Sequence, residues 1–176
     1  RSFKQRYGAP PRQFDLDSFR NTRREEFERF MKGQAGVPQF TSLPAGENPD
    51  GFTVQLRDLP ARTVAYIRVL DPYREGVVHA ACQRLLDWAI ACGLADGQWL
   101  GYMWEEPEIV ALKDCRYDVA LVVDDVEPDC AIARFEFPPM RVAEVVIRGD
   151  IELEARAIDW LYKTWLPGSG YVPDDQ

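Results

Sequence analysis

The sequence predicts an α+β fold built from two copies of a strand–strand–helix–strand–strand unit, preceded by short N-terminal helices. Two observations predict the duplication. Leu59-Pro60-Ala61-Arg62 and Pro138-Pro139-Met140-Arg141 each lead into a strand, and each strand pair precedes a helical segment with an interior tryptophan, Trp88 or Trp160. We expect each copy to form an antiparallel sheet with one long helix, and the two copies to surround a central cleft. The second copy stops at Gln176 before its last two strands, which predicts a truncated C-terminus.

The first 51 residues form two sections of different composition. Residues 1–32 predict two short helices separated by Gly8-Ala9-Pro10-Pro11, because Gly and Pro end one helix and Pro favours the first turn of the next. Residues 33–51 contain four Gly and three Pro with almost no periodic apolar pattern, which is typical of a linker. The main domain is expected over residues 52–176.

The first copy begins with residues 52–57 and 62–69, which are rich in β-branched side chains and alternate in polarity. The short connection between them predicts a hairpin. Residues 74–93 predict a helix that ends at Gly93. Its apolar stripe consists of Val78, Cys82, Leu85, Ala89 and Cys92. Residues 98–104 and 116–123 predict two further strands.

The second copy repeats this order. Residues 131–137 and 140–148, joined by Pro138-Pro139, predict a second hairpin. Gly149 and Asp150 then open a helix that extends to Leu166. The inner face of this helix consists of Leu153, Ala157, Trp160, Leu161 and Thr164.

Charge is distributed unevenly along the chain. The net charge is −8, but residues 1–33 hold nine Lys and Arg against five Asp and Glu, so the remainder carries −12. A basic N-terminal section indicates contact with a polyanion, or alternatively a solvated charged helix. The acidic remainder argues against nucleic-acid binding there, because phosphates require a positive surface.

Composition and motif content argue against several classes of protein. No apolar run approaches the roughly 20 residues that cross a bilayer, and no leader follows Arg1, so we expect a cytoplasmic piece of a longer chain. Four cysteines and the single His79 lack the paired spacing of a zinc site, so no metal is expected. No phosphate-binding loop or nucleophile motif is present, so we expect neither a cofactor nor enzyme activity.

The N-terminal section resembles part of a known DNA-binding domain. The stretch Ser2-Phe3-Lys4-Gln5-Arg6-Tyr7-Gly8-Ala9-Pro10-Pro11-Arg12-Gln13-Phe14 resembles the end of the second helix-turn-helix of AraC-type transcription regulators. The family usually places Arg after the last aromatic residue, where this chain has Asp15. The resemblance implies that Lys4, Arg6 and Arg12 contact DNA, although so few charges neutralise only a few phosphates.

Residues 52–176 resemble the GyrI-like effector-binding domain, which is attached to many such regulators. The matching stretches are Leu59-Pro60-Ala61-Arg62-Thr63-Val64-Ala65-Tyr66, Asp71-Pro72-Tyr73, Cys115-Arg116-Tyr117-Asp118-Val119 and Trp165-Leu166-Pro167-Gly168-Ser169-Gly170-Tyr171. The resemblance implies a ligand cleft between the two repeat halves. The next strand of the family normally carries a ligand-facing glutamate, which this sequence lacks.

Aromatic pairs on the predicted strands are candidates for the ligand site. Tyr102 and Trp104 lie two residues apart, so both point to one face of a sheet, either into the core or into a pocket. The resemblance favours the pocket. Phe135 and Phe137 also share a face, and for them we expect a place in the core.

Two carboxylates interrupt apolar strands. Asp118 requires a hydrogen-bond partner if buried, and the alternative to a ligand is a structural link to Arg116 or a backbone amide. Glu144 could hold a cationic ligand together with aromatic rings, or form a solvent-facing salt bridge. The predicted ligand-binding residues are Tyr66, Tyr102, Trp104, Asp118, Glu144 and Tyr171.

The function expected from these features is sensing. A lipophilic or cationic aromatic ligand would bind in the cleft and control an attached DNA-binding domain. The alternatives are a GyrI-like hydrolase acting on cyclopropane-bearing natural products, and a module that inhibits another protein. The expected partners are a small amphipathic ligand, and DNA through the mostly missing N-terminal domain. No membrane partner is expected, and a homodimer stays open.

Overall fold

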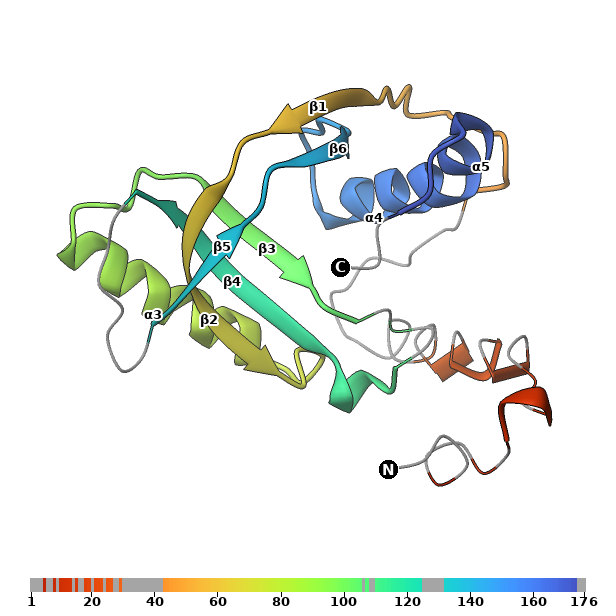
Figure 1. Ribbon diagram of the computed structural model, residues 1–176, viewed down its shortest axis with the longest axis horizontal. Helices are drawn as coiled ribbons and strands as arrows, with labels where there is room; N and C mark the ends of the chain where they lie inside the picture. The colour runs from red at the N-terminus through yellow and green to blue at the C-terminus, as the bar shows by residue number, and fades with distance from the viewer. Residues whose placement is uncertain are drawn as a thin grey trace. The chain divides into compact units, whose positions relative to one another are not determined.

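The computed structural model describes residues 43–105, 107, 110–124 and 132–173, together with scattered positions between 5 and 29 (Figure 1). The chain divides into two compact units. The first unit contains Arg62–Phe137, and the second contains Pro138–Gln176 together with the residues before Arg62 from Met31 onwards. Each unit is described by itself below.

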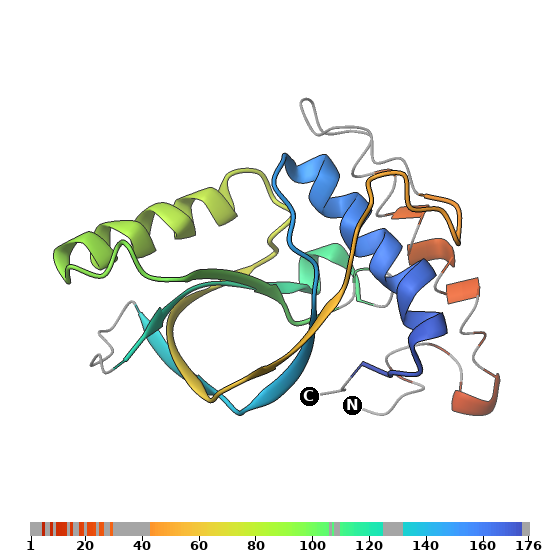
Figure 2. The same cartoon turned by 90° about the horizontal axis from the view of Figure 1, so that it is seen from above.

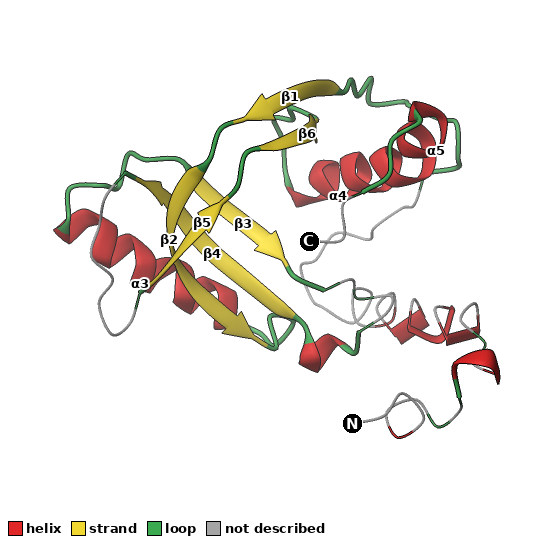
Figure 3. Cartoon of the chain, in the orientation of Figure 1, coloured by secondary structure: helices red, strands yellow, loops and turns green. Residues whose placement is uncertain are grey.

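The first unit is built on a four-stranded antiparallel sheet with the order β3-β4-β2-β5 (Figure 3). The strands are β2 (Arg62–Leu70), β3 (Trp99–Met103), β4 (Arg116–Val123) and β5 (Ala133–Phe137). Register places Arg68 opposite Asp118, and Tyr102 opposite the same Asp118. It also places Arg62 opposite Phe137. Gly101 in β3 has no side chain, and an added Cβ there would overlap the Tyr117 hydroxyl.

One face of this sheet packs against the helix α3 (Val77–Ala91), which lies along the curved sheet in Figure 2. Alternate residues of each strand point to this face, as strand geometry requires. The buried cluster combines side chains from β2, β4 and α3: Ala65, Ile67, Val69, Val119, Leu121, Val123, Ala81, Leu85 and Ala89. The predicted helix stripe is therefore largely confirmed, but Cys92 is exposed and Ala81 takes a place in the core.

The ends of α3 follow from two glycines. Gly76 precedes the helix with a left-handed φ of 78°, so the helix begins at Val77 rather than at the predicted residue 74. Gly93 follows it with a φ of 72°, and the amide of Leu94 donates to the carbonyl of Ala89 at 2.7 Å. This is a Schellman-type C-terminus, and it confirms the predicted end of the helix.

The second unit pairs β1 (Gln55–Leu59) with β6 (Met140–Glu144) as a two-stranded antiparallel sheet. The helix α4 (Ile151–Trp160) follows and continues as a π-helical turn (Leu161–Trp165) and a short helix α5 (Leu166–Ser169). Asp150 caps α4 by accepting a hydrogen bond from the Leu153 amide at 3.1 Å. Phe52, Ala157 and Trp160 form the buried centre, with the two rings 5.6 Å apart.

The two predicted hairpins are wrong, although their strands exist. β1 pairs with β6 instead of β2, and β5 pairs with β2 instead of β6. Tight hairpins favour turn residues with positive φ, whereas the connections here contain Pro60 and Pro138-Pro139, whose φ is held near −65°. Each unit therefore contains one strand from the other repeat copy. The α+β class with antiparallel sheets is confirmed.

Within the described residues, no helix is both long and apolar enough to cross a bilayer. Of the predicted helix that begins near Pro11, the structure describes a 3-10 turn (Pro11–Gln13) and helical residues at 18, 19, 21–23, 25, 26 and 29. The other positions of residues 1–42 lie largely outside the described residues.

Candidate functional site

The face of the first sheet that points away from α3 carries five aromatic side chains, and we call it the aromatic face. β2 contributes Tyr66, β3 contributes Tyr102 and is followed directly by Trp104, and β5 contributes Phe135 and Phe137. All five are half-buried. The charged residues on the same face are Arg62, Arg68, Arg116 and Asp118.

Four of the rings form a connected cluster. The Tyr102 and Trp104 centroids lie 5.6 Å apart, and those of Phe135 and Phe137 lie 4.9 Å apart. Tyr102 contacts Phe137 at 5.3 Å, and Trp104 contacts Phe135 at 5.9 Å. All four pairs meet edge to face, the arrangement that the ring quadrupoles favour.

Asp118 is the buried charge at the base of this cluster. Its side chain is completely buried, and Arg68 binds it through two hydrogen bonds, from Nε to Oδ1 at 2.9 Å and from Nη2 to Oδ2 at 2.8 Å. The indole Nε1 of Trp104 donates to Oδ2 at 2.6 Å. The hydrogen bonds from Arg68 raise the pKa of that guanidinium. A buried carboxylate with three donors is fully compensated.

Arginine side chains also fix the orientation of Trp104. The Cζ of Arg68 lies 5.0 Å from the Trp104 ring centroid, and the Cζ of Arg116 lies 5.7 Å from it. Arg116 in turn binds Glu105, whose carboxylate accepts from the Arg116 Nε at 2.6 Å and from its backbone amide at 2.8 Å. The alternative weighed for Asp118, a structural link to Arg116 or a backbone amide, is therefore right in kind but wrong in its partner. Asp118 is bound instead by Arg68, which faces it across the β2–β4 register.

Four of the six predicted ligand-binding residues lie on this one face: Tyr66, Tyr102, Trp104 and Asp118. The other two belong to the second unit. Glu144 on β6 accepts two hydrogen bonds from Arg57 Nη1, at 3.0 and 2.8 Å, which is the salt bridge weighed as its alternative role. Tyr171 stacks on Trp165 with centroids 6.1 Å apart and is largely exposed.

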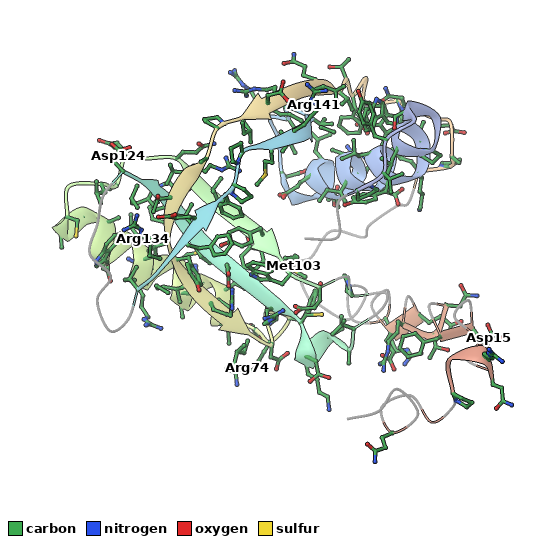
Figure 4. The ribbon with its side chains drawn as sticks, in the orientation of Figure 1. Asp15, Arg74, Met103, Asp124, Arg134 and Arg141 are labelled. Carbon is green, nitrogen blue, oxygen red and sulfur yellow. The ribbon has the colours of Figure 1, made fainter. Side chains whose placement is uncertain are left out.

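Several residues of the aromatic face were not found from the sequence. Phe135 and Phe137 were expected in the core, but both are only half-buried and belong to neither buried cluster. The signal that finds them is parity along the strand, since both share the face of Tyr66 once β5 is paired with β2. Arg62 and Arg68 have the same parity as Tyr66 on β2, so they lie on the same face. Figure 4 shows the side chains of this sheet, with Met103 and Arg134 labelled.

The predicted DNA-contacting residues are only partly described. Lys4 and Arg6 lie outside the described residues, whereas Arg12 is exposed in the 3-10 turn. Among the described His, Cys, Asp and Glu side chains, no group of three is arranged to hold a metal ion. His79 is exposed on α3, and Cys82, Cys92 and Cys115 are free thiols.

The second unit contains a groove. A groove of about 530 Å³ runs between α4 and the chain that follows β6. It is lined by Val145, Ile147, Gly149, Asp150, Glu154, Ala157, Ile158 and Leu161. None of the six predicted ligand-binding residues lines this groove.

Comparison with known proteins relates this chain to small-molecule-binding domains. The family model described as GyrI-like small molecule binding domain matches residues 52–176. A DNA gyrase inhibitor from Serratia proteamaculans (strain 568) is 32% identical over 130 residues, covering 69% of this chain and 81% of that protein.

Two solved structures of EcmrR are also similar. The crystal structure of its C-terminal domain has 14% identity and a TM-score of 0.49, covering 69% of this chain and 78% of that one. The cryo-EM structure of the EcmrR–DNA complex has 12% identity and a TM-score of 0.51, covering 90% of this chain. This chain spans 56% of that EcmrR chain, and the two share a fold.

Proposed function

We propose that this chain, which belongs to the GyrI-like family of small-molecule-binding domains, is the effector-sensing part of an AraC-type transcription regulator. The ligand would be a flat, lipophilic molecule bound on the aromatic face, and its binding would change the affinity of an attached domain for DNA. A ligand has this effect only if it binds two states of the protein with different affinity.

The observation that carries the ligand class is the ring cluster of the aromatic face. Half-buried rings offer large apolar surfaces that stay partly accessible, and a flat ligand gains by stacking on them or meeting their edges. The described residues of this face give less support for catalysis than for binding. Among the described residues, Asp118 on this face and Glu105 just beyond β3 are both held by arginines, so we propose a binding role without turnover.

A positive charge on the ligand has weaker support than its flat, lipophilic character. Glu144 and Asp118 were the candidate carboxylates for a cation, and each is already paired with an arginine, Arg57 or Arg68. A cation would therefore be attracted by ring faces alone.

The link to transcription rests on the order of the two resemblances along the chain. The AraC-type stretch precedes the ligand domain, and the similarly folded EcmrR has been solved in complex with DNA. The proposal assigns the same division of labour to this protein, with DNA contacts made by the N-terminal section and residues 52–176 sensing the ligand.

The direct test is a titration of the chain with the neutral probe 2-naphthamide, followed by amide chemical shifts in NMR. We expect the shifts to concentrate on β2, β3 and β5, because these strands carry the rings. Shifts confined to residues that line the groove of the second unit would contradict the proposed site. Absence of saturable binding by this and other flat probes would contradict the proposed ligand class.

A protein-binding inhibitor is the second candidate, favoured by the 32% identity with a DNA gyrase inhibitor. A supercoiling assay with purified gyrase separates the two. Inhibition by the chain at near-stoichiometric concentration, without any small molecule, would favour the inhibitor role over the sensor role.

A further inference from the structure

Arg62 differs from the other arginines of the aromatic face because it has no carboxylate partner among the residues that the structure describes. Arg68 binds Asp118, and Arg116 binds Glu105. The guanidinium of Arg62 instead lies over the Phe137 ring, with Cζ 5.4 Å from the centroid, and its Nε is buried without a hydrogen-bond acceptor among the described residues. A buried donor on a charged group that lacks an acceptor costs free energy.

No carboxylate of the sheet takes the place of that partner. By register the nearest candidate is Asp124, which directly follows Val123, the residue opposite Thr63. Asp124 is exposed at the end of β4, as Figure 4 shows, and no ion pair joins it to Arg62 in the part of the chain that the structure describes.

Tyr102 provides a second donor beside the same ring. Its hydroxyl is buried beside Asp118 but meets no acceptor among the described residues with full hydrogen-bond geometry, and its ring meets Phe137 edge to face at 5.3 Å. Burial is the main cause that raises the pKa of Tyr102, and the charge of Asp118 and an interaction with its side chain add to it. The hydroxyl is protonated at neutral pH, as that of an ordinary tyrosine is. Arg62 and Tyr102 thus both adjoin Phe137, and each has hydrogen-bonding capacity to spare.

We propose that the aromatic face selects a flat aromatic ligand that carries a carboxylate, which Arg62 and Tyr102 bind beside Phe137. This proposal rests on the proposed function and names the ligand class of the same site. A guanidinium matches a carboxylate with two parallel N–H donors, and a neutral phenol adds a third. The ring cluster binds the apolar part of the ligand. A sugar phosphate has no such apolar part, so it does not belong to the proposed ligand class.

This conclusion reverses the expectation from net charge. The chain after residue 33 carries −12, and an acidic surface taken as a whole repels anions. Local charge determines binding at short range, because pairs separated by more than about 8–10 Å are largely screened at physiological salt. At the aromatic face the acidic groups Asp118 and Glu105 are neutralised by their own partners, whereas Arg62 has no ion-pair partner in the described part of the chain.

Three probes of the same shape test the proposal by calorimetry on the whole chain at neutral pH: 2-naphthoate, neutral 2-naphthamide and cationic 2-naphthylmethylammonium. We expect naphthoate to bind roughly 10-fold tighter than naphthamide, and the cation most weakly. Arg62→Gln should remove the preference for naphthoate, because it should weaken naphthoate binding much more than naphthamide binding. Arg62→Lys keeps the charge but loses the planar fork, so it should retain part of the preference.

Two further variants serve as controls. Arg134→Gln removes a positive charge from the other face of β5, where Arg134 is opposite Ala65 of the α3-facing core, and should leave the preference intact. Tyr102→Phe should weaken both naphthoate and naphthamide, by roughly 3- to 10-fold, since each offers an acceptor oxygen.

The outcomes separate this proposal from the proposed function. Binding of all three probes with equal affinity, tightest binding of the cation, or an unchanged preference in Arg62→Gln would overturn the carboxylate proposal and leave an aromatic-binding sensor. Failure of every probe to bind would overturn both.

Discussion

Arg68 and Asp118, 50 residues apart in the sequence, face each other across β2 and β4 and share two parallel hydrogen bonds of 2.9 and 2.8 Å. The pair is asymmetric, because Asp118 is completely buried whereas a third of the Arg68 side chain is exposed. Loss of one partner therefore has a different cost from loss of the other.

We expect Arg68→Met to lower the free energy of unfolding by about 3–5 kcal/mol, because a buried carboxylate then lacks its counter-ion. Asp118→Leu leaves a partly exposed guanidinium that water can solvate, so this variant should lose less. The double variant Arg68→Met/Asp118→Leu should be more stable than Arg68→Met alone. Urea denaturation measures all three, and a double variant as unstable as the sum of the single losses would contradict the pairing argument.

Trp104 is expected to contribute directly to ligand binding. Trp104→Ala removes a ring from the cluster and should weaken 2-naphthamide by about 1–3 kcal/mol, roughly 5- to 150-fold. Trp99→Ala is the matched control, because Trp99 lies on β3, which Trp104 directly follows, and has the opposite parity. Trp104→Phe keeps an aromatic ring but loses the hydrogen bond to Asp118. Calorimetry that finds equal losses for Trp99→Ala and Trp104→Ala would remove the aromatic face from ligand binding.

Local patterning was sufficient to predict the strands, the helix α3 and the shared face of Tyr102 and Trp104. Alternation and helical periodicity are properties of short segments, so they can be read without knowledge of the partners. Strand pairing was not predictable in the same way. The match of β1 with β6 joins residues more than 80 positions apart, such as Arg57 and Glu144, and no turn motif encodes it.

The same limit applies to the charged part of the site. Asp118 could be recognised as a buried carboxylate in need of a partner, but the identity of that partner depends on the β2–β4 register. Sequence proximity favoured Arg116, whose side chain reaches Glu105 instead. No sequence pattern indicates a role for Arg62, because the lack of a partner for its Nε among the described residues is a property of the folded sheet.

Glu144 gives a prediction in which the structure changes the expected result. From the sequence, Glu144 could hold a cationic ligand or form a solvent-facing salt bridge, and in the first case Glu144→Gln would weaken cationic probes selectively. In the second unit it is bound by Arg57, whose side chain is about half exposed. We now expect Glu144→Gln to lower stability by less than about 1 kcal/mol and to leave 2-naphthylmethylammonium binding unchanged. Thermal melting and calorimetry check the two parts, and a selective loss for the cation would restore the original role.

We expect no turnover, because the described acidic groups at the aromatic face are already hydrogen-bonded to other residues. A glycosidase-like or hydrolase-like mechanism needs a carboxylate free to accept or donate a proton within reach of the substrate. Asp118 accepts three hydrogen bonds, and Glu105 is held by both the side chain and the backbone of Arg116. Incubation of the chain with a cyclopropane-bearing natural product, followed by liquid chromatography, should therefore give no protein-dependent hydrolysis. Steady hydrolysis that Glu105→Gln or Asp118→Asn abolishes, while Glu136→Gln on the other face of β5 leaves it intact, would establish the hydrolase instead of the sensor.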